Sequence, residues 1–436
     1  MTTGRGTGEP FTRNGRRGRY ARAGLRGPNA AAGPGGPNAR AGLLAVVLAL
    51  LLAPTPVRAQ EAQVPELGRA EGFGAAATGG GRGKEYVVRN VADGGPDSLR
   101  EGAERSEPLR IRFAVSGEIH LATPLRVARD KTIDGRGASA RITGKGLLLE
   151  QPNVILENLV FGPFDQGERQ DAVGLHRGAR NVWIDHCSFS GAPDKAIEII
   201  GGATDVTVSW SAFRDQEQVI QAGAFATGEA DREIRLTVHH NFFEGTGYRN
   251  PRISYGKAHA FNNVLRGWKE HGMSVRRNGE LASEANVFEA GADKSAIELS
   301  GGKDDKDESP GFARSTGDLL LNGADAKTRE PGRVFDPAQF YLAQVDRADA
   351  ALVDRVVKGA GWHEYPPLAP AVTAPLPLPT TSDGRSGPDR ATPTTTASSD
   401  GGSGDVLVAA AAGAGVTLLA VLAVLVFRRR RRPSPV

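Results

Sequence analysis

The sequence predicts an all-β protein, a right-handed parallel β-helix with short capping helices, joined to one C-terminal transmembrane helix. The first observation is a nine-residue phrase of alternating apolar and polar residues, which recurs every 22 to 30 residues between positions 153 and 288. The second is an uncharged apolar run, residues 406–427, near the C-terminus. The third is the single cysteine, Cys187, which excludes a disulfide scaffold and a Cys-based zinc cluster.

The N-terminal segment, residues 1–59, is typical of a secretory signal peptide. An Arg-rich leader precedes the apolar stretch 41–53, and residues 57–59 offer a small-residue cleavage site. A short membrane anchor is the alternative. A helix of 13 residues spans only about 20 Å, less than the ~30 Å hydrocarbon core of a bilayer, so a signal peptide is favoured.

The recurring phrase predicts the central domain, residues 60–365. It reads NVILENLVF, NVWIDHCSF, DVTVSWSAF and RLTVHHNFF, with looser copies KAHAFNNVL and ELASEANVF, and the copies begin at Asn153, Asn181, Asp205, Arg235, Lys257 and Glu280. Period-two alternation rich in Val, Ile and aromatic residues indicates strands. A spacing of about 22 residues is too short for a crossover helix in every repeat and is typical of stacked β-helix coils. The asparagines near the sixth position either stack as a hydrogen-bonded ladder or reflect a turn preference: Asn158, Asn241, Asn262 and Asn286.

The C-terminal part divides into four segments. Residues 340–362 carry apolar residues at helical spacing, and we expect this helix to cap an open end of the β-helix. Residues 366–405, rich in Pro, Thr, Ser and Gly, predict a disordered linker. Residues 406–427 are long enough to span a bilayer as a helix. The basic tail, residues 428–436, is expected to stay in the cytoplasm.

Charge is distributed unevenly along the chain. The formal net charge is +4, but nine arginines lie in residues 1–59 and five in residues 428–432, which leaves 40 basic and 49 acidic residues between them. A nucleic-acid partner is therefore not predicted. Within this acidic region, residues 249–277 contain seven basic residues and one acid, Glu270. This segment is either a binding face for an anion, since Arg pairs well with carboxylates, or a solvated basic face.

Three carboxylates, Asp171, Asp194 and Glu198, form a candidate metal site. Asp194 and Glu198 are four residues apart, so they lie on one face of a strand. Asp171 precedes the NVWIDH phrase and is expected one coil earlier. Hard oxygen ligands on stacked strands suit Ca²⁺, although solvated acids are the alternative.

Several motifs in one order carry a family resemblance. From residue 70 to residue 362 the chain contains GFGAAATGGGRG, SLRE, TIDGRG, NVWIDHCSF, DKAIEI, DVTVSWSAF, LTVHHNFF, GYRNPRISYGKAHAFNN, MSVRRNGELASEANVFE and VVKGAGW. This combination closely resembles the pectate lyase superfamily of right-handed parallel β-helices. The resemblance implies that Asp171, Asp194 and Glu198 are calcium ligands and that Arg249, which opens RNPR, is the catalytic base.

The implied reaction is Ca²⁺-dependent β-elimination on an acidic polysaccharide, pectate, pectin or another polyuronate. Arg252, Lys257 and Arg276 are the candidate substrate-binding cations. The two ends of the chain predict an exported enzyme at the cell surface, anchored by the C-terminal helix, and we expect it to be a monomer.

The chain departs from the family pattern at three positions. Gln218 stands where the family commonly has Lys, Ser254 where it has a second Arg, and Arg169 where it has a further acid. These changes are expected to weaken the grip on substrate and on Ca²⁺. They leave open a non-catalytic, polysaccharide-binding β-helix. A β-helix glycoside hydrolase would need clustered Asp pairs, which the sequence does not offer.

Overall fold

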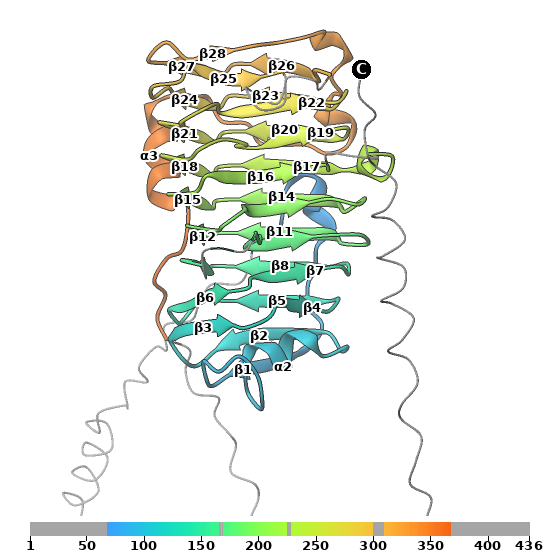
Figure 1. Cartoon of the computed structure of the whole chain (residues 1–436), viewed down its shortest axis with the longest axis vertical. Coiled ribbons are helices and arrows are strands. Elements are labelled where there is room, and N and C mark those ends of the chain that lie inside the picture. Colours follow the sequence, from blue (N-terminus) through green and yellow to red (C-terminus); the bar gives the residue numbers. More distant parts are fainter. Residues whose placement is uncertain (1–67, 165–166, 168, 225–227, 300–308, 368–436) are drawn as a thin grey trace, which may run out of the picture. The chain divides into compact units, whose positions relative to one another are not determined.

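The fold is a right-handed parallel β-solenoid of about nine coils (Figure 1). The computed structural model describes residues 68–164, 167, 169–224, 228–299 and 309–367. The predicted signal peptide, linker, transmembrane helix and basic tail lie outside these residues. In the part of the chain that is described, no helix is long and apolar enough to cross a membrane.

Three parallel sheets run along the solenoid: the first coil contributes only β1, and each later coil contributes one strand to each of the three sheets. Sheet 1 contains β1 (Lys84–Val88), β2 (Leu109–Phe113), β5 (Lys131–Asp134), β8 (Val154–Glu157), β11 (Arg180–Asp185), β14 (Thr204–Ser209), β17 (Arg235–His239), β20 (Lys257–Phe261), β23 (Glu280–Glu284) and β26 (Phe312–Thr316). Sheet 2 contains β4 (Leu125–Val127), β7 (Leu147–Leu149), β10 (Val173–Leu175), β13 (Lys195–Ile199), β16 (Gln218–Ala222), β19 (Arg252–Ser254), β22 (Met273–Arg276), β25 (Ser295–Glu298) and β28 (Asp325–Ala326). Sheet 3 contains β3 (Gly117–Leu121), β6 (Ala140–Gly144), β9 (Val160–Phe161), β12 (Ser188–Phe189), β15 (Ala212–Arg214), β18 (Phe242–Glu244), β21 (Val264–Arg266), β24 (Val287–Glu289) and β27 (Leu319–Leu321).

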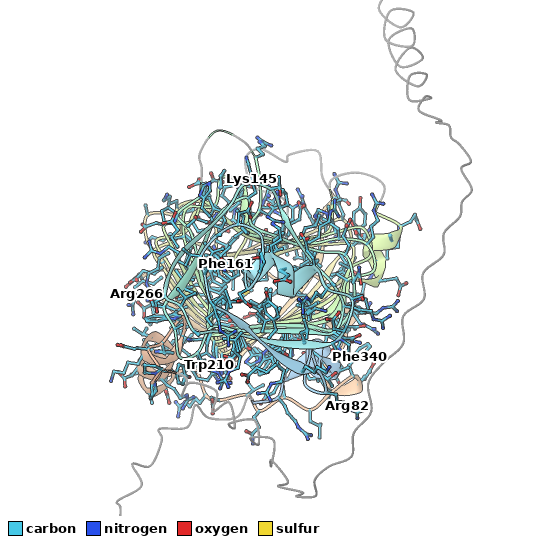
Figure 2. The ribbon with its side chains drawn as sticks, turned by 90° about the horizontal axis from the view of Figure 1, so that it is seen from below. Arg82, Lys145, Phe161, Trp210, Arg266 and Phe340 are labelled. Atoms are coloured by element: carbon cyan, nitrogen blue, oxygen red, sulfur yellow. The ribbon has the colours of Figure 1, made fainter. Side chains whose placement is uncertain are left out.

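The core lies inside the coils, where equivalent apolar residues stack from one coil to the next. Val154, Val182 and Val206 pair in register along sheet 1 and are fully buried, as their place in the recurring phrase predicts. On sheet 3 the phenylalanines that end three of the phrases stack face to face, with ring centroids 4.8 Å and 5.0 Å apart: Phe161, Phe189 and Phe213. Figure 2, a view along the solenoid, shows Phe161 in the interior and Arg266 at the periphery.

The turn from sheet 1 to sheet 3 repeats one backbone conformation. Left-handed φ angles of 44° to 54° recur at Asn158, His186, Trp210, His240, Asn262 and Ala285. Asn is among the few residues other than Gly that adopt this region readily. The asparagines at the sixth position of the phrase, Asn158 and Asn262, therefore serve the turn and not the expected ladder.

An asparagine ladder does form one residue later in the coil. Asn241 donates to the side-chain oxygen of Asn263 at 3.0 Å, and Asn263 donates to that of Asn286 at 2.9 Å. All three are fully buried. The prediction was right for Asn241 and Asn286, whereas Asn263 takes the place expected for Asn262.

The short helix α2 (Leu99–Glu104) closes the first coil. Its N-cap residue Ser98 accepts a hydrogen bond from the backbone of Glu101, and Leu99 and Ala103 join the core. Figure 1 shows α2 beside β1 at one end of the solenoid, which fits the predicted capping role. Four 3-10 helices complete the described helical elements: η1 (Gly72–Ala76), η2 (Ala230–Glu233), η3 (Pro331–Arg333) and η4 (Pro337–Gln339).

The second helix, α3 (Ala350–Gly359), forms where the sequence predicts a helix but does not cap an open end. Its buried residues Leu352 and Val356 pack against Phe242 and Val264, which project outward from sheet 3. The expected position was therefore wrong, because the apolar stripe of the helix finds its partner on the side of the solenoid.

Candidate active site

The structure brings the three predicted carboxylates together on sheet 2. Asp194 immediately precedes β13, Glu198 lies within β13, and Asp171 lies two residues before β10, the strand of the preceding coil. In the ladder Glu198 pairs with Gly174 of β10. Asp171 is thus one coil earlier, as the sequence predicts.

Lys195 lies at the centre of these carboxylates, and sequence reasoning missed it. Its Nζ atom is 2.6 Å from Asp194 Oδ2, 3.2 Å from Asp171 Oδ1 and 3.2 Å from Glu198 Oε1. The lysine is only 5% exposed. The sequence did place Lys195 between two of the proposed ligands, Asp194 and Glu198. Whether its side chain points towards them, however, depends on the fold.

The carboxylates also contact other groups of this chain. Glu198 Oε2 is 3.1 Å from Nε2 of His176, and Asp194 Oδ1 accepts a hydrogen bond of 3.2 Å from the side chain of Gln218. Asp171 Oδ1 also accepts from the backbone N–H of Lys195 at 3.1 Å. We refer to Asp171, Asp194, Lys195 and Glu198 as the Lys195 cluster.

Burial and charge shift the pKa values of this cluster in different directions. Burial and then Glu198 raise the pKa of Asp171 to about 7, although Lys195 acts against them. Burial acts to raise the pKa of Glu198, but His176 and Lys195 outweigh it and lower the pKa to about 2. Burial acts to lower the pKa of Lys195, but Asp171, Glu198 and Asp194 outweigh it, so this pKa is raised. Lys195 therefore carries its positive charge at neutral pH.

The arrangement bears on the calcium ion that the family resemblance implies. Carboxylate oxygens are the donors that Ca²⁺ prefers, at about 2.3–2.6 Å. One oxygen of each carboxylate, however, already contacts the Lys195 ammonium group. Ligand atoms of Asp171, His176 and Glu198 do lie within 4.8 Å of one another. A calcium ion among them, however, would stand beside the Lys195 ammonium group and compete with it for the carboxylates, so the donor set as arranged does not fit Ca²⁺.

Arg249 lies in the turn that precedes β19, beside β16 of sheet 2. Its backbone carbonyl accepts from Ile220 N–H of β16, and its Nη1 donates to Oε1 of Gln221. Gln221 pairs directly with Glu198 in the ladder between β13 and β16. Arg249 is 6% exposed, and its guanidinium carbon lies 5.0 Å from the centre of the Tyr248 ring.

Two of the three predicted substrate-binding cations share this sheet. Arg252 of β19 pairs with Gln221 in the ladder, and Arg276 of β22 pairs with Ser254. Both alternate with core residues of their strands, so their side chains project away from the solenoid interior, and both are buried against neighbouring groups. Arg252 lies 5.8 Å from the Tyr248 ring centre, close to Arg249.

The third predicted cation, Lys257, is not brought to this sheet. It opens β20 of sheet 1, and its Nζ lies 3.2 Å from Glu280 Oε1. The interpretation of residues 249–277 as one basic face does not hold, because the coil distributes these residues over all three sheets.

The three departures from the family pattern have different surroundings. Gln218 pairs with Lys195 in the ladder and contacts Asp194, so it belongs to the edge of the Lys195 cluster. The hydroxyl of Ser254 accepts a hydrogen bond of 2.9 Å from Nε of Arg276. The side chain of Arg169 is exposed.

A cavity of about 270 Å³ lies on sheet 1, away from the candidate residues of sheet 2. Glu157 and Asp185, neighbours in the ladder between β8 and β11, contribute to its wall. Burial and then Asp185 raise the pKa of Glu157 to about 9, although Arg136 acts against them. The pair therefore holds a proton at neutral pH. Sequence reasoning missed it, because only the coil register places the two residues side by side.

The chain is similar to known proteins in both sequence and structure. A family model described as pectate lyase matches residues 119–326. Probable pectate lyase 13 of Arabidopsis thaliana is 32% identical over 308 residues, which cover 66% of this chain and 61% of that relative. Pectate lyase 1 of Juniperus ashei is 33% identical over 326 residues, which cover 67% of this chain and 87% of that relative. The chain thus spans about three fifths of the first relative and most of the second.

The solved structures share the fold. The crystal structure of the major allergen from cedar pollen has a TM-score of 0.60 and 29% identity, with 67% of this chain and 93% of that chain covered. A pectate lyase from Xanthomonas campestris has a TM-score of 0.53 and 22% identity, with 66% of this chain and 97% of that chain covered. The second likeness supports the parallel β-solenoid alone.

Proposed function

Because the chain belongs to the pectate lyase family, we propose that it is a polysaccharide lyase that cleaves pectate or another polyuronate by β-elimination. The observation that carries the proposal is that the side chain of Arg249 contacts Gln221 of β16, whose backbone pairs with that of Glu198 in the Lys195 cluster. Sheet 2 also contributes Arg252 and Arg276, so cations suited to a polyanionic chain follow its strands.

The reaction requires a base but no water. The base takes a proton from C5 of a uronate residue, which is acidic because it is α to the C6 carboxylate. The electron pair left on C5 forms the C4=C5 double bond as the C4–O glycosidic bond breaks, and the departing oxygen takes up a proton from solvent. The paired acid and base carboxylates of a glycoside hydrolase are therefore not needed. Arg249 is the proposed base. A base must first be in its neutral form, and a neighbouring cation favours that form of a cationic group; Arg252, beside the same Tyr248 ring, is proposed to supply this charge.

Negative charge develops on the substrate carboxylate as the C5 proton leaves. Preorganised cations stabilise such charge most effectively where water is excluded. We assign this role to Arg252 and Arg276, which are buried along sheet 2. Calcium would supply the same stabilisation in the form of the reaction that the resemblance implies. In this chain Lys195 holds the carboxylates that would bind the ion.

The surroundings of the enzyme are also a proposal. We propose that the signal peptide directs export and that residues 406–427 anchor the monomeric domain at the cell surface through the linker 366–405. Fractionation of cells that produce the full chain tests this. The full chain should sediment with membranes, and a chain ending at residue 405 should be released.

One assay tests the reaction. The full chain is incubated with polygalacturonate, and the ultraviolet absorbance of the 4,5-unsaturated product is followed alongside the number of new reducing ends. Both should rise together. New reducing ends without absorbance would instead indicate hydrolysis.

A second candidate is a non-catalytic β-helix that binds polysaccharide. Ser254 favours it, because its hydroxyl is held by Arg276 where the family commonly has a second Arg. Retention on immobilised polygalacturonate without any unsaturated product would support this alternative.

A further inference from the structure

We propose that Lys195 is a built-in cation that occupies the carboxylate cluster in place of a metal ion, so that the cluster does not take up Ca²⁺. This inference rests on the proposed function only where it concerns activity. The claim that the cluster does not bind Ca²⁺ is independent of that function.

The first argument is the geometry of the ammonium group. A lysine ammonium has three N–H donors, and each of the three carboxylates has an oxygen within 3.2 Å of Nζ. The donors are therefore matched one to one with the carboxylates. An ammonium group used in this way has no donor left for a substrate carboxylate.

The second argument is that the lysine is anchored in this position. Lys195 is 5% exposed, and its backbone N–H donates to Asp171, the same residue that its side chain contacts. Its strand β13 is paired on both sides, with β10 and with β16. The side chain therefore cannot leave the cluster without uncovering three carboxylates that are now partly buried.

The third argument is that the remaining carboxylate contacts do not call for a metal. His176 contacts the second oxygen of Glu198, and Gln218 donates to the second oxygen of Asp194. A partly buried anion needs a partner for its charge and for its lone pairs, and for Asp194 and Glu198 this chain supplies both from its own side chains. A calcium ion would have to displace Lys195 and stand beside its positive charge.

It follows that the Lys195 cluster and the arginines near sheet 2 have different roles. The Lys195 cluster positions β10, β13 and β16, and through β16 it supports Gln221, which contacts Arg249. Recognition of the substrate carboxylate is left to the arginines. Lys195 is thus a positioning residue.

Calcium titration of the full chain by isothermal calorimetry tests the inference without reference to activity. The wild-type chain should show no saturable binding up to about 1 mM Ca²⁺. Lys195→Gln should bind about one ion per chain, with a Kd at least tenfold below that limit, about 0.1 mM or less. Adding Asp194→Asn to Lys195→Gln should abolish that binding. Lys358→Gln, which removes an exposed lysine paired with Asp354 on α3, should behave as the wild type.

Two results would overturn the inference: saturable Ca²⁺ binding by the wild type that Asp194→Asn removes, or a folded Lys195→Gln chain that still rejects Ca²⁺. If Lys195→Gln does not fold, Lys195→Arg keeps the charge and should reject Ca²⁺ as the wild type does. Saturable binding of Ca²⁺ by the Lys195→Arg chain below about 1 mM would contradict the proposal.

The polygalacturonate assay in excess chelator separates the two proposals. Product formation in chelator supports both. Product that appears only with added Ca²⁺ overturns the role of Lys195 and leaves the lyase proposal standing. The absence of product under both conditions overturns the lyase proposal, while the titration still decides the role of Lys195.

Discussion

Gln221 accepts a hydrogen bond from the guanidinium group of Arg249 and pairs directly with Glu198 in the neighbouring strand. One residue thus connects the proposed base to the Lys195 cluster, through its side chain on one side and its backbone pairing on the other. The left-handed backbone of Arg249, with φ at 65°, aims the residue from a turn and not from a strand. Its position therefore depends on a side-chain contact, which makes Gln221 the natural point at which to test the site.

Replacing Arg249 by Lys should lower the rate of unsaturated-product formation by about 100-fold or more, because a general base commonly contributes at least that factor. Lysine keeps the charge but loses the planar fork that reaches Gln221. The rate is measured by ultraviolet absorbance on polygalacturonate. Arg266→Lys is the matched control, since Arg266 pairs with Glu289 on sheet 3. Equal rates for Arg249→Lys and the wild type would refute the assignment of the base.

Replacing Gln221 by Leu should lower kcat by about tenfold, because misplacement of a catalytic group is costly even when binding survives. The KM should change less, since Gln221 is not proposed to contact substrate. Steady-state kinetics measure both quantities. A variant with the wild-type kcat and a raised KM would show that Gln221 binds substrate and does not position Arg249.

The repeat in the sequence predicts the coil well, because alternation and spacing follow from burying one side of every strand. Val154, Val182 and Val206 lie where the phrase places them. The asparagine ladder was harder, since Asn262 and Asn263 are adjacent and only the backbone turn decides which one faces the neighbouring coil.

The candidate site was only partly predictable for a related reason. Asp194 and Glu198 are close in sequence, and their common face follows from strand geometry. The roles of Lys195 and Gln221 depend on contacts between coils. Lys195 contacts Asp171, 24 residues away, and Gln221 contacts Arg249, 28 residues away. The register between neighbouring coils determines such contacts, and this register cannot be read from the composition of the sequence. The same limit explains why Lys257 belongs to another sheet.

Replacing Asn263 by Ala should destabilise the fold by about 2 kcal/mol, because it leaves buried partners on both neighbouring coils unsatisfied. Asn263 accepts from Asn241 and donates to Asn286. Urea unfolding of the wild type and the variant measures the change. Asn90→Ala, which removes two exposed hydrogen bonds, to Pro96 and from Ala92, should cost much less. Equal losses for the two variants would mean that the ladder contributes nothing beyond an ordinary surface hydrogen bond.

The Glu157–Asp185 pair should make the fold less stable as pH rises. Glu157 has an ordinary pKa near 4.5 and a pKa of about 9 in the fold, where burial and then Asp185 favour its protonated form. Between these values the folded chain holds a proton that the unfolded chain has released. The free energy of unfolding therefore falls with increasing pH in this window, by on the order of 1 kcal/mol per pH unit.

Replacing Glu157 by Gln isolates this effect, because the amide is neutral at every pH and matches the protonated acid in shape. The variant should be about as stable as the wild type near pH 5 and increasingly more stable towards pH 9, as measured by urea unfolding across that range. Glu150→Gln is the control, since Glu150 pairs with Arg126 at the surface and should leave the pH profile of the wild type unchanged. If the wild type and Glu157→Gln lost stability in parallel as pH rose, Glu157 would be ionised in the fold, and Arg136, which already acts in that direction, would be its dominant partner.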